Sequence, residues 1–123
     1  MKIIAVDDDF ISLNLLSDFL QGDRYHDVTL RSSALDALGT LRNEEVPFDC
    51  ILLDIEMPEL SGIDLCREIR CLEAYRSAPI LMLTRLRDQS SITQAFANGA
   101  TDYIEKPFDA FEVLTRINVA ERL

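Results

Sequence analysis

Three short apolar runs divide the chain, at residues 3–6, 50–53 and 80–83. Each run is continuous rather than alternating with polar residues, which is typical of strands covered on both faces and therefore of a parallel sheet. Two weaker runs, at 28–30 and 103–105, mix polar and apolar residues. They indicate two further strands at the edges of the same sheet.

Apolar residues at helical spacing separate the five runs. The five helix faces are formed by Leu13, Leu16 and Leu20; by Ala34, Leu38 and Leu41; by Leu65, Ile69 and Leu72; by Ile92, Ala95 and Phe96; and by Phe111, Leu114 and Ile117. Gly99 follows the fourth face, where helices often end. Strict alternation of strand and helix predicts an α/β fold with right-handed crossovers and helices on both faces of the sheet.

The strand order follows from the same pattern. Three strongly apolar strands flanked by two mixed ones favour the order 2-1-3-4-5, a flavodoxin-like doubly wound five-stranded parallel sheet. The 123 residues contain no repeat, low-complexity segment or linker, so we expect one domain over residues 1–123. The chain ends just after the last helix, which fits either a stand-alone domain or a piece of a longer protein.

The balance of charge limits the classes of partner. The chain has 22 acidic against 12 basic residues and a formal net charge of −10. Such a surface repels phosphate backbones, so we expect no direct nucleic-acid binding. No apolar run approaches the roughly 20 residues that span a bilayer. The first residues lack the pattern of a signal peptide, so we expect a cytoplasmic protein without membrane contact.

The cysteines and the single histidine give no sign of a soft metal site. The cysteines Cys50, Cys66 and Cys71 are odd in number and lack Cys-x-x-Cys spacing, which argues against a disulfide or a zinc site. Cys50 lies in an apolar run and is expected in the core. His26 has no second histidine as a partner and is expected to be an ordinary surface or loop residue.

Polar side chains stand directly after four of the expected strands. They are Asp7, Asp8 and Asp9 after the first run, Asp54 after the third, Thr84 after the fourth and Lys106 after the fifth. In open α/β sheets, ligands bind beyond the carboxyl ends of the strands, near the point where the strand order reverses. We therefore expect these side chains to meet at one rim of the sheet.

The acidic residues at this rim predict a cation site. Carboxylates a few ångströms apart repel one another, so either some of them are protonated or a cation lies among them. Oxygen ligands without histidine or thiolate favour Mg²⁺, which commonly bridges carboxylates and a phosphoryl group. Lys106, one of two lysines in the chain, supplies a compact positive charge for a transferring phosphoryl group, and the Thr84 hydroxyl is a second donor. Asp54 is then the candidate nucleophile, since aspartate forms acyl phosphates.

Each of these residues also has a purely local interpretation. The alternatives are helix caps at Asp7 and Asp8, a turn at Asp54, a helix N-cap at Thr84 and a solvated strand end at Lys106. We expect Asp9 to cap the first helix. Four polar strand ends of complementary types at one rim favour a site over chance placement.

At these residues the chain closely resembles the receiver domain of two-component response regulators. The resemblance runs from Lys2 to about Arg122. The matching segments are 4–9, 50–58 with Gly62, 81–84 and 99–108. No single segment is specific, but together they are.

The resemblance implies a phosphorelay function. Asp54 would be the phosphoacceptor, and a histidine kinase or phosphotransfer protein would be the donor. Asp7, Asp8, Asp54 and the backbone carbonyl of Glu56 would hold Mg²⁺. Lys106 would contact the phosphoryl group, next to a cis Lys106–Pro107 bond. The domain would catalyse its own phosphorylation and dephosphorylation as a signalling module rather than act as an enzyme on other substrates.

The resemblance also implies a switch. Thr84 and Tyr103 would form the switch pair, with the Thr84 hydroxyl drawn to the new anion and the Tyr103 ring moving inward. The change would remodel the surface formed by the fourth helix, the fifth strand and the fifth helix. An output domain, an effector protein or a second copy of this domain would dock there upon phosphorylation.

One position departs from the family pattern. The residue after Thr84 is usually small in this family, and here it is Arg85. Its guanidinium could slow the access of water or donor, pair with a phosphoryl oxygen, or point into solvent. Glu56 and Leu86 stand at positions that tune dephosphorylation, in a direction that the sequence leaves open.

Three other functions compete with this interpretation. Residues 7–9 contain an Asp-x-Asp like that of haloacid dehalogenase-type phosphatases, but that family usually has a larger chain and Thr or Val where Ile11 stands, and it leaves Asp54 unexplained. A flavodoxin-like FMN module needs a phosphate loop rich in Ser, Thr and Gly, which three aspartates contradict. A pseudo-receiver that binds partners without phosphorylation is opposed by the intact acceptor, acidic pair and lysine.

Overall fold

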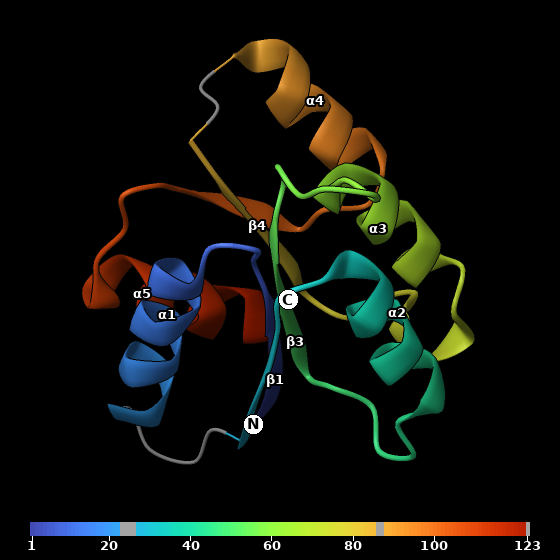
Figure 1. The fold of residues 1–123 in the computed structure, drawn as a ribbon, viewed down its shortest axis with the longest axis horizontal. Helices are drawn as coiled ribbons and strands as arrows, with labels where there is room; N and C mark the ends of the chain where they lie inside the picture. Colours follow the sequence, from blue (N-terminus) through green and yellow to red (C-terminus); the bar gives the residue numbers. More distant parts are fainter. Residues whose placement is uncertain (23–26, 86–87, 123) are drawn as a thin grey trace.

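The computed structural model describes residues 1–22, 27–85 and 88–122 (Figure 1). The strands are β1 (Lys2–Val6), β2 (Asp27–Arg31), β3 (Cys50–Asp54), β4 (Ile80–Thr84) and β5 (Asp102–Glu105). The helices are α1 (Phe10–Gly22), α2 (Ala34–Asn43), α3 (Gly62–Arg70), α4 (Gln89–Ala97) and α5 (Ala110–Glu121), with a short 3-10 helix, η1, at Glu73–Tyr75.

Within the described residues, five parallel strands form one sheet in the order β2-β1-β3-β4-β5. This confirms the predicted order, with the two mixed strands at the edges. The order reverses at β1, so the carboxyl ends of β1 and β3 adjoin. The register pairs Val6 with Leu53, Asp54 with Leu83 and Thr84 with Glu105, which aligns the polar strand ends along one rim.

The sheet separates the apolar interior into two clusters because neighbouring strand residues point to opposite faces. On one face, Ile4 and Val6 pack with residues of α2, α3 and α4. On the other, Ile3 and Ala5 pack with residues of α1 and α5. Figure 1 shows α1 and α5 on one side of the sheet and α2 and α3 on the other.

Local sequence signals set the beginnings of the helices. Four helices start at a side chain that accepts a hydrogen bond from an N–H three residues later, namely Ser33 for α2, Ser61 for α3, Asp88 for α4 and Asp109 for α5. Each such cap stabilises its helix by about 1 kcal/mol. Asp88 caps α4, so the interpretation of Thr84 as the cap of that helix is wrong.

Three residues of the predicted helix faces do not pack on the core from a helix as expected. Leu72 follows the end of α3 and packs on the core from the turn before η1. Phe96 and Phe111 lie in α4 and α5 but are 43% and 80% exposed. Both helices bury smaller side chains instead, namely Ala95 in α4 and residues such as Val113 in α5.

Arg70, the last residue of α3, ties three segments together through backbone carbonyls. Its Nε and Nη2 donate to the carbonyl of Gly99 at 2.9 and 2.7 Å, and its Nη1 donates to Tyr75 and Ala78 at 2.8 and 2.6 Å. Gly99 follows α4 with φ of 106°, in the left-handed region that favours glycine, as predicted. The end of α4 is therefore held against α3.

None of the helices in the described part of the chain combines the length and the apolar character needed to cross a membrane.

Candidate functional site

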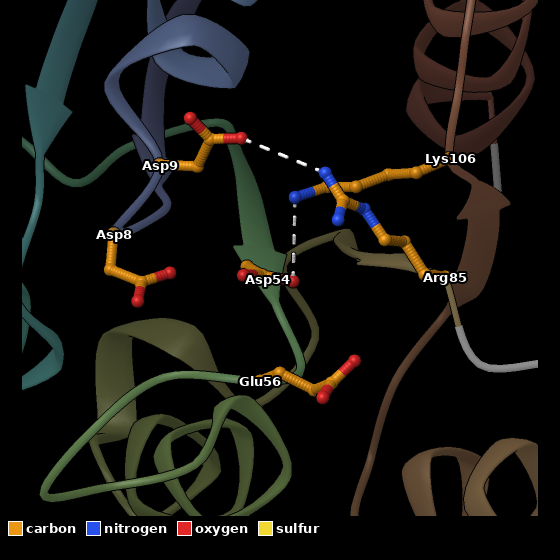
Figure 2. Close-up of a pocket in the computed structure, with 6 residues that line it drawn as sticks. All are labelled: Asp8, Asp9, Asp54, Glu56, Arg85 and Lys106. Atoms are coloured by element: carbon orange, nitrogen blue, oxygen red, sulfur yellow. Dashed lines mark ion pairs between the residues drawn. The ribbon is translucent and has the colours of Figure 1, made fainter.

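The carboxyl ends of β1, β3, β4 and β5 surround a pocket of about 190 Å³. Its lining residues are Asp8, Asp9, Asp54, Glu56, Arg85 and Lys106 (Figure 2). The structure thus brings the predicted acidic, basic and nucleophilic residues to one rim, from segments far apart in the sequence.

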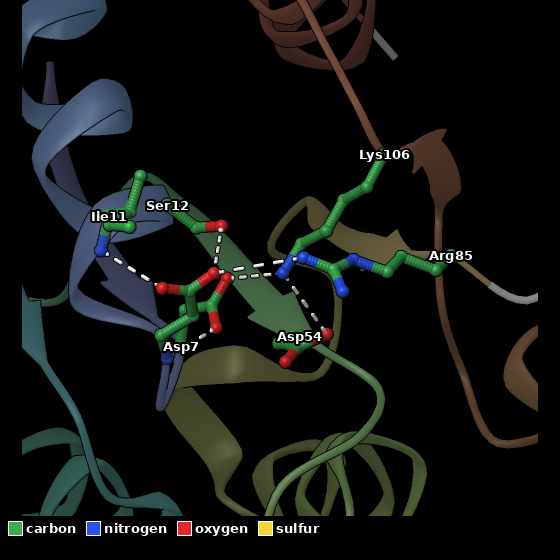
Figure 3. Close-up of polar contacts among 7 residues, drawn as sticks. Asp7, Ile11, Ser12, Asp54, Arg85 and Lys106 are labelled. Carbon is green, nitrogen blue, oxygen red and sulfur yellow. Dashed lines mark hydrogen bonds and ion pairs between the residues drawn. The ribbon is translucent and has the colours of Figure 1, made fainter.

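Lys106 lies between two carboxylates at the base of this pocket. Its Nζ donates to Asp7 Oδ2 at 2.7 Å and lies 3.6 Å from Asp54 Oδ1 (Figure 3). Asp7 is fully buried, and its other oxygen accepts from the backbone N–H of Asp9 at 2.9 Å. The interpretation of Lys106 as a solvated strand end is therefore wrong, because its side chain is buried and paired.

A backbone contact sets the position of Lys106. Its N–H donates to the carbonyl of Thr84 at 2.7 Å, which continues the pairing of β4 and β5 beyond their last residues. The bond between Lys106 and Pro107 is cis, as the resemblance implies. The Thr84 side chain is buried at the end of β4.

Asp54 combines burial with a neighbouring like charge. The residue is 6% exposed at the end of β3. Burial and the adjacent Asp7 carboxylate raise the pKa of Asp54 to about 7, although Lys106 acts in the opposite direction. A buried and paired carboxylate of this kind is not an ordinary turn residue.

Three carboxylates form the acidic part of the site. One oxygen each of Asp7, Asp8 and Asp54 lies within 4.8 Å of the others. Asp8 is exposed and opens to the pocket, whereas the other two are buried. One lysine ammonium cannot balance three carboxylates, so the cluster has the charge and the hard oxygen donors that suit a divalent cation.

Asp9 caps α1, as predicted. Its carboxylate accepts from the N–H of Ile11 at 3.0 Å and from the hydroxyl of Ser12 at 3.2 Å. The hydrogen bond from Ile11 is the main cause that lowers the pKa of Asp9. Asp9 Oδ2 also lies 3.9 Å from Nη2 of Arg85, in an exposed ion pair.

The remaining predicted residues lie around the pocket. Tyr103 is half-buried in β5, and its ring meets Phe96 of α4 edge-on with 6.2 Å between centroids. The side chain of Glu56 is exposed and lines the pocket. Leu86 and His26 lie outside the described residues.

Gly62 has a role in the site that sequence reasoning missed. A Cβ atom at this position would collide with the backbone carbonyl of Asp54, and its N–H donates to the carbonyl of Ile55 at 2.8 Å. The start of α3 thereby packs directly on the end of β3. A glycine at the first position of a helix, after the Ser61 cap, is the signal that could have indicated this close approach.

The chain is similar to known proteins along nearly its whole length. The family model for the response regulator receiver domain matches residues 3–118. The transcriptional regulatory protein KdpE of Staphylococcus aureus is 35% identical over 122 residues, which cover 99% of this chain and 50% of that protein. The chain thus spans about half the length of such relatives.

Solved structures show the same architecture. The BeF3-activated receiver domain of DrrB, a Thermotoga maritima protein, has a TM-score of 0.85 and 33% identity, with coverage of 99% of this chain and 97% of that one. The receiver domain of the sensor histidine kinase PA1611 of Pseudomonas aeruginosa has a TM-score of 0.87 and 27% identity, covering 99% and 98%. These relatives do not favour the phosphatase or the FMN module. With its strand order, its acidic rim and the family match over residues 3–118, this chain belongs to the response regulator receiver domain family.

Proposed function

We propose that this domain is a phosphorylation switch in which Asp54 accepts a phosphoryl group. The observation that carries the proposal is the position of Asp54, which lines an open pocket close to the Lys106 ammonium and to the carboxylates of Asp7 and Asp8. The whole chain, residues 1–123, is one receiver domain.

A bound Mg²⁺ completes the site in this proposal. The carboxylates of Asp7, Asp8 and Asp54 are hard oxygen donors within 4.8 Å of one another, which fits this ion. The backbone carbonyl of Glu56 is the fourth protein ligand. The PA1611 receiver domain is described with a magnesium ion coordinated in its active-site cleft, which supports the assignment. When bound, Mg²⁺ neutralises carboxylate charge and polarises a phosphoryl oxygen.

Each residue has a defined task in the transfer. An Asp54 carboxylate oxygen attacks phosphorus, a new Oδ–P bond forms, and the bond from phosphorus to the donor breaks with its electron pair leaving on the donor. Lys106 stabilises charge on the phosphoryl oxygens, and the Thr84 hydroxyl donates to one of them. Glu56, Arg85 and Leu86 tune the access of donor and water. The domain catalyses these steps on itself and has no separate substrate.

The partners follow from the same chemistry. The donor is a phosphohistidine of a histidine kinase or phosphotransfer protein. Thr84 and Tyr103 transmit the change to the surface of α4, β5 and α5, where an output domain, an effector or a second copy of this domain docks. Relatives such as KdpE are named transcriptional regulatory proteins, which supports an output in gene control through another part of the protein. In this proposal the domain acts in the cytoplasm, and it makes no direct contact with nucleic acid or membrane.

Intact-mass analysis after incubation with acetyl phosphate tests the proposal. We expect the gain of one phosphoryl group that requires Mg²⁺ and is lost in Asp54→Asn. Asp64→Asn removes an exposed carboxylate of α3 and is the matched control, which should gain the group like the wild type.

A failure with acetyl phosphate leads to the same test with a phosphohistidine donor protein. A gain there would show that Asp54 accepts only from a protein donor. No gain from either donor would refute the acceptor role and favour a pseudo-receiver that binds partners without being phosphorylated.

A further inference from the structure

Arg85 and Asp9 stand on opposite sides of Asp54 at the mouth of the pocket. Asp9 precedes α1 on the β1 side, Arg85 directly follows β4, and β3, which carries Asp54, lies between β1 and β4 in the sheet. The ion pair of Arg85 with Asp9, with 3.9 Å between Nη2 and Oδ2, therefore crosses over the end of β3 (Figure 2). The guanidinium therefore lines the same pocket as Asp54, on the side of β4.

This ion pair is held loosely. The side chains of Arg85 and Asp9 are 73% and 37% exposed, and exposed ion pairs contribute little to stability. Asp9 keeps its hydrogen bonds from Ile11 and Ser12 if the guanidinium leaves. Arg85 is thus free to change partners without disturbing the start of α1.

Phosphorylation of Asp54 would offer Arg85 a stronger partner. An acyl phosphate places about two negative charges where the carboxylate had one. Lys106 is already bonded to Asp7 at 2.7 Å, so it does not balance that charge alone. A guanidinium can bind phosphate oxygens through two parallel N–H donors. The present contact of Arg85 with Asp9 is weaker, because it is an exposed ion pair with 3.9 Å between Nη2 and Oδ2.

We propose that Arg85 exchanges Asp9 for the phosphoryl group on Asp54 and thereby prolongs the phosphorylated state. Hydrolysis requires water to attack phosphorus opposite the Asp54 oxygen. A new bond from phosphorus to the water oxygen forms, the Oδ–P bond breaks, Asp54 recovers its carboxylate, and the products are inorganic phosphate and a proton. A guanidinium over the pocket mouth occupies the path of that water. This inference rests on the proposed role of Asp54.

A spectroscopic experiment on the wild type tests the exchange directly. The full chain with Mg²⁺ is titrated with beryllofluoride, a stable mimic of the phosphoryl group, while NMR records backbone amides and the Nε–Hε signals of arginine. We expect the Arg85 signal to shift together with the amides around Asp54. If those amides shift and the Arg85 signal does not, the exchange is refuted while the role of Asp54 stands. If neither responds, the acceptor role itself fails, and the exchange with it.

The lifetime of the phosphorylated state gives the second test. The chain is phosphorylated with acetyl phosphate, freed of donor, and followed by intact mass in Mg²⁺. We expect Arg85→Ala to shorten the half-life about three- to fivefold. The half-life of Arg85→Lys should lie between those of the wild type and Arg85→Ala, because lysine keeps the positive charge but lacks the paired N–H donors of the guanidinium. Arg67→Ala removes an exposed arginine of α3, paired with Asp64 at 3.3 Å, and should leave the half-life unchanged. A half-life in Arg85→Ala equal to or longer than in the wild type overturns the proposal.

Discussion

Ionised Asp54 should destabilise the metal-free fold, so Asp54→Asn should make it more stable. The pKa of this carboxyl is raised from 3.8 to about 7 by burial and by Asp7. At about 1.36 kcal/mol per pKa unit, the ionised form would cost up to about 4 kcal/mol. The carboxylate opens to a solvent-filled pocket, which screens part of this cost, so we expect a gain of about 1–2 kcal/mol for the variant.

The dependence on pH has a definite sign. Because the pKa in the folded state is raised above that of the unfolded chain, protonated Asp54 contributes stability below about pH 4, and that contribution is lost as the pH rises through about 7. The advantage of Asp54→Asn should therefore be complete at about pH 8 and shrink toward pH 4.

Urea denaturation in EDTA at several pH values measures this difference. Asp64→Asn, at an exposed carboxylate, controls for the loss of one negative charge and should show little change. Added Mg²⁺ should reverse the order, since an ion at 100 times its Kd stabilises the wild type by about 2.7 kcal/mol. The electrostatic reasoning would be refuted if Asp54→Asn were no more stable than the wild type at about pH 8 in EDTA. It would also be refuted if the difference in the free energy of unfolding did not change with pH.

Two further predictions concern residues that support the site. Arg70→Lys should lower the free energy of unfolding by about 2–3 kcal/mol, because one ammonium cannot bond at the same time all the carbonyls that the guanidinium bonds. The exposed Arg67→Lys should change it little, and equal effects of the two variants in urea denaturation would contradict this. Gly62→Ala should slow phosphorylation by acetyl phosphate at least about tenfold, because its Cβ displaces the Asp54 carbonyl. Gly39→Ala, with no atom near its Cβ, should keep the wild-type rate and gain up to about 1 kcal/mol from helix propensity.

The sheet was predictable because its signal is local and strong. Runs such as 50–53 are buried on both faces, and continuous apolar runs of that length in alternation with helices admit few topologies. The meeting of Asp7, Asp54 and Lys106 followed from topology, because parallel strands bring their carboxyl ends to one rim. Their burial and the pairing of Lys106 with Asp7 rather than with solvent required the structure.

Other features were beyond the sequence because they depend on distant backbone. Phe96 and Phe111 match a helical period, but Phe111 is largely exposed and Phe96 lies against Tyr103 at the surface rather than in the core. The contacts of Arg70 join carbonyls of residues five to 29 positions away, and carbonyls carry no sequence signal. The ion pair of Arg85 with Asp9 likewise depends on how far two side chains from distant segments reach over the strand between them.

The hold of Arg70 on Gly99 has a mechanical consequence for α4. The helix buries Ala95 near its carboxyl end, and the Gly99 carbonyl just beyond accepts two hydrogen bonds from Arg70. A rigid rotation of α4 about that end would keep these contacts, whereas a translation would break them. For a helix of nine residues, about 13.5 Å long, a tilt of about 10° moves the first turn by roughly 2 Å. Asp88 bonds to Ser91 within that same turn, so such a tilt would carry the cap along without breaking its hydrogen bonds.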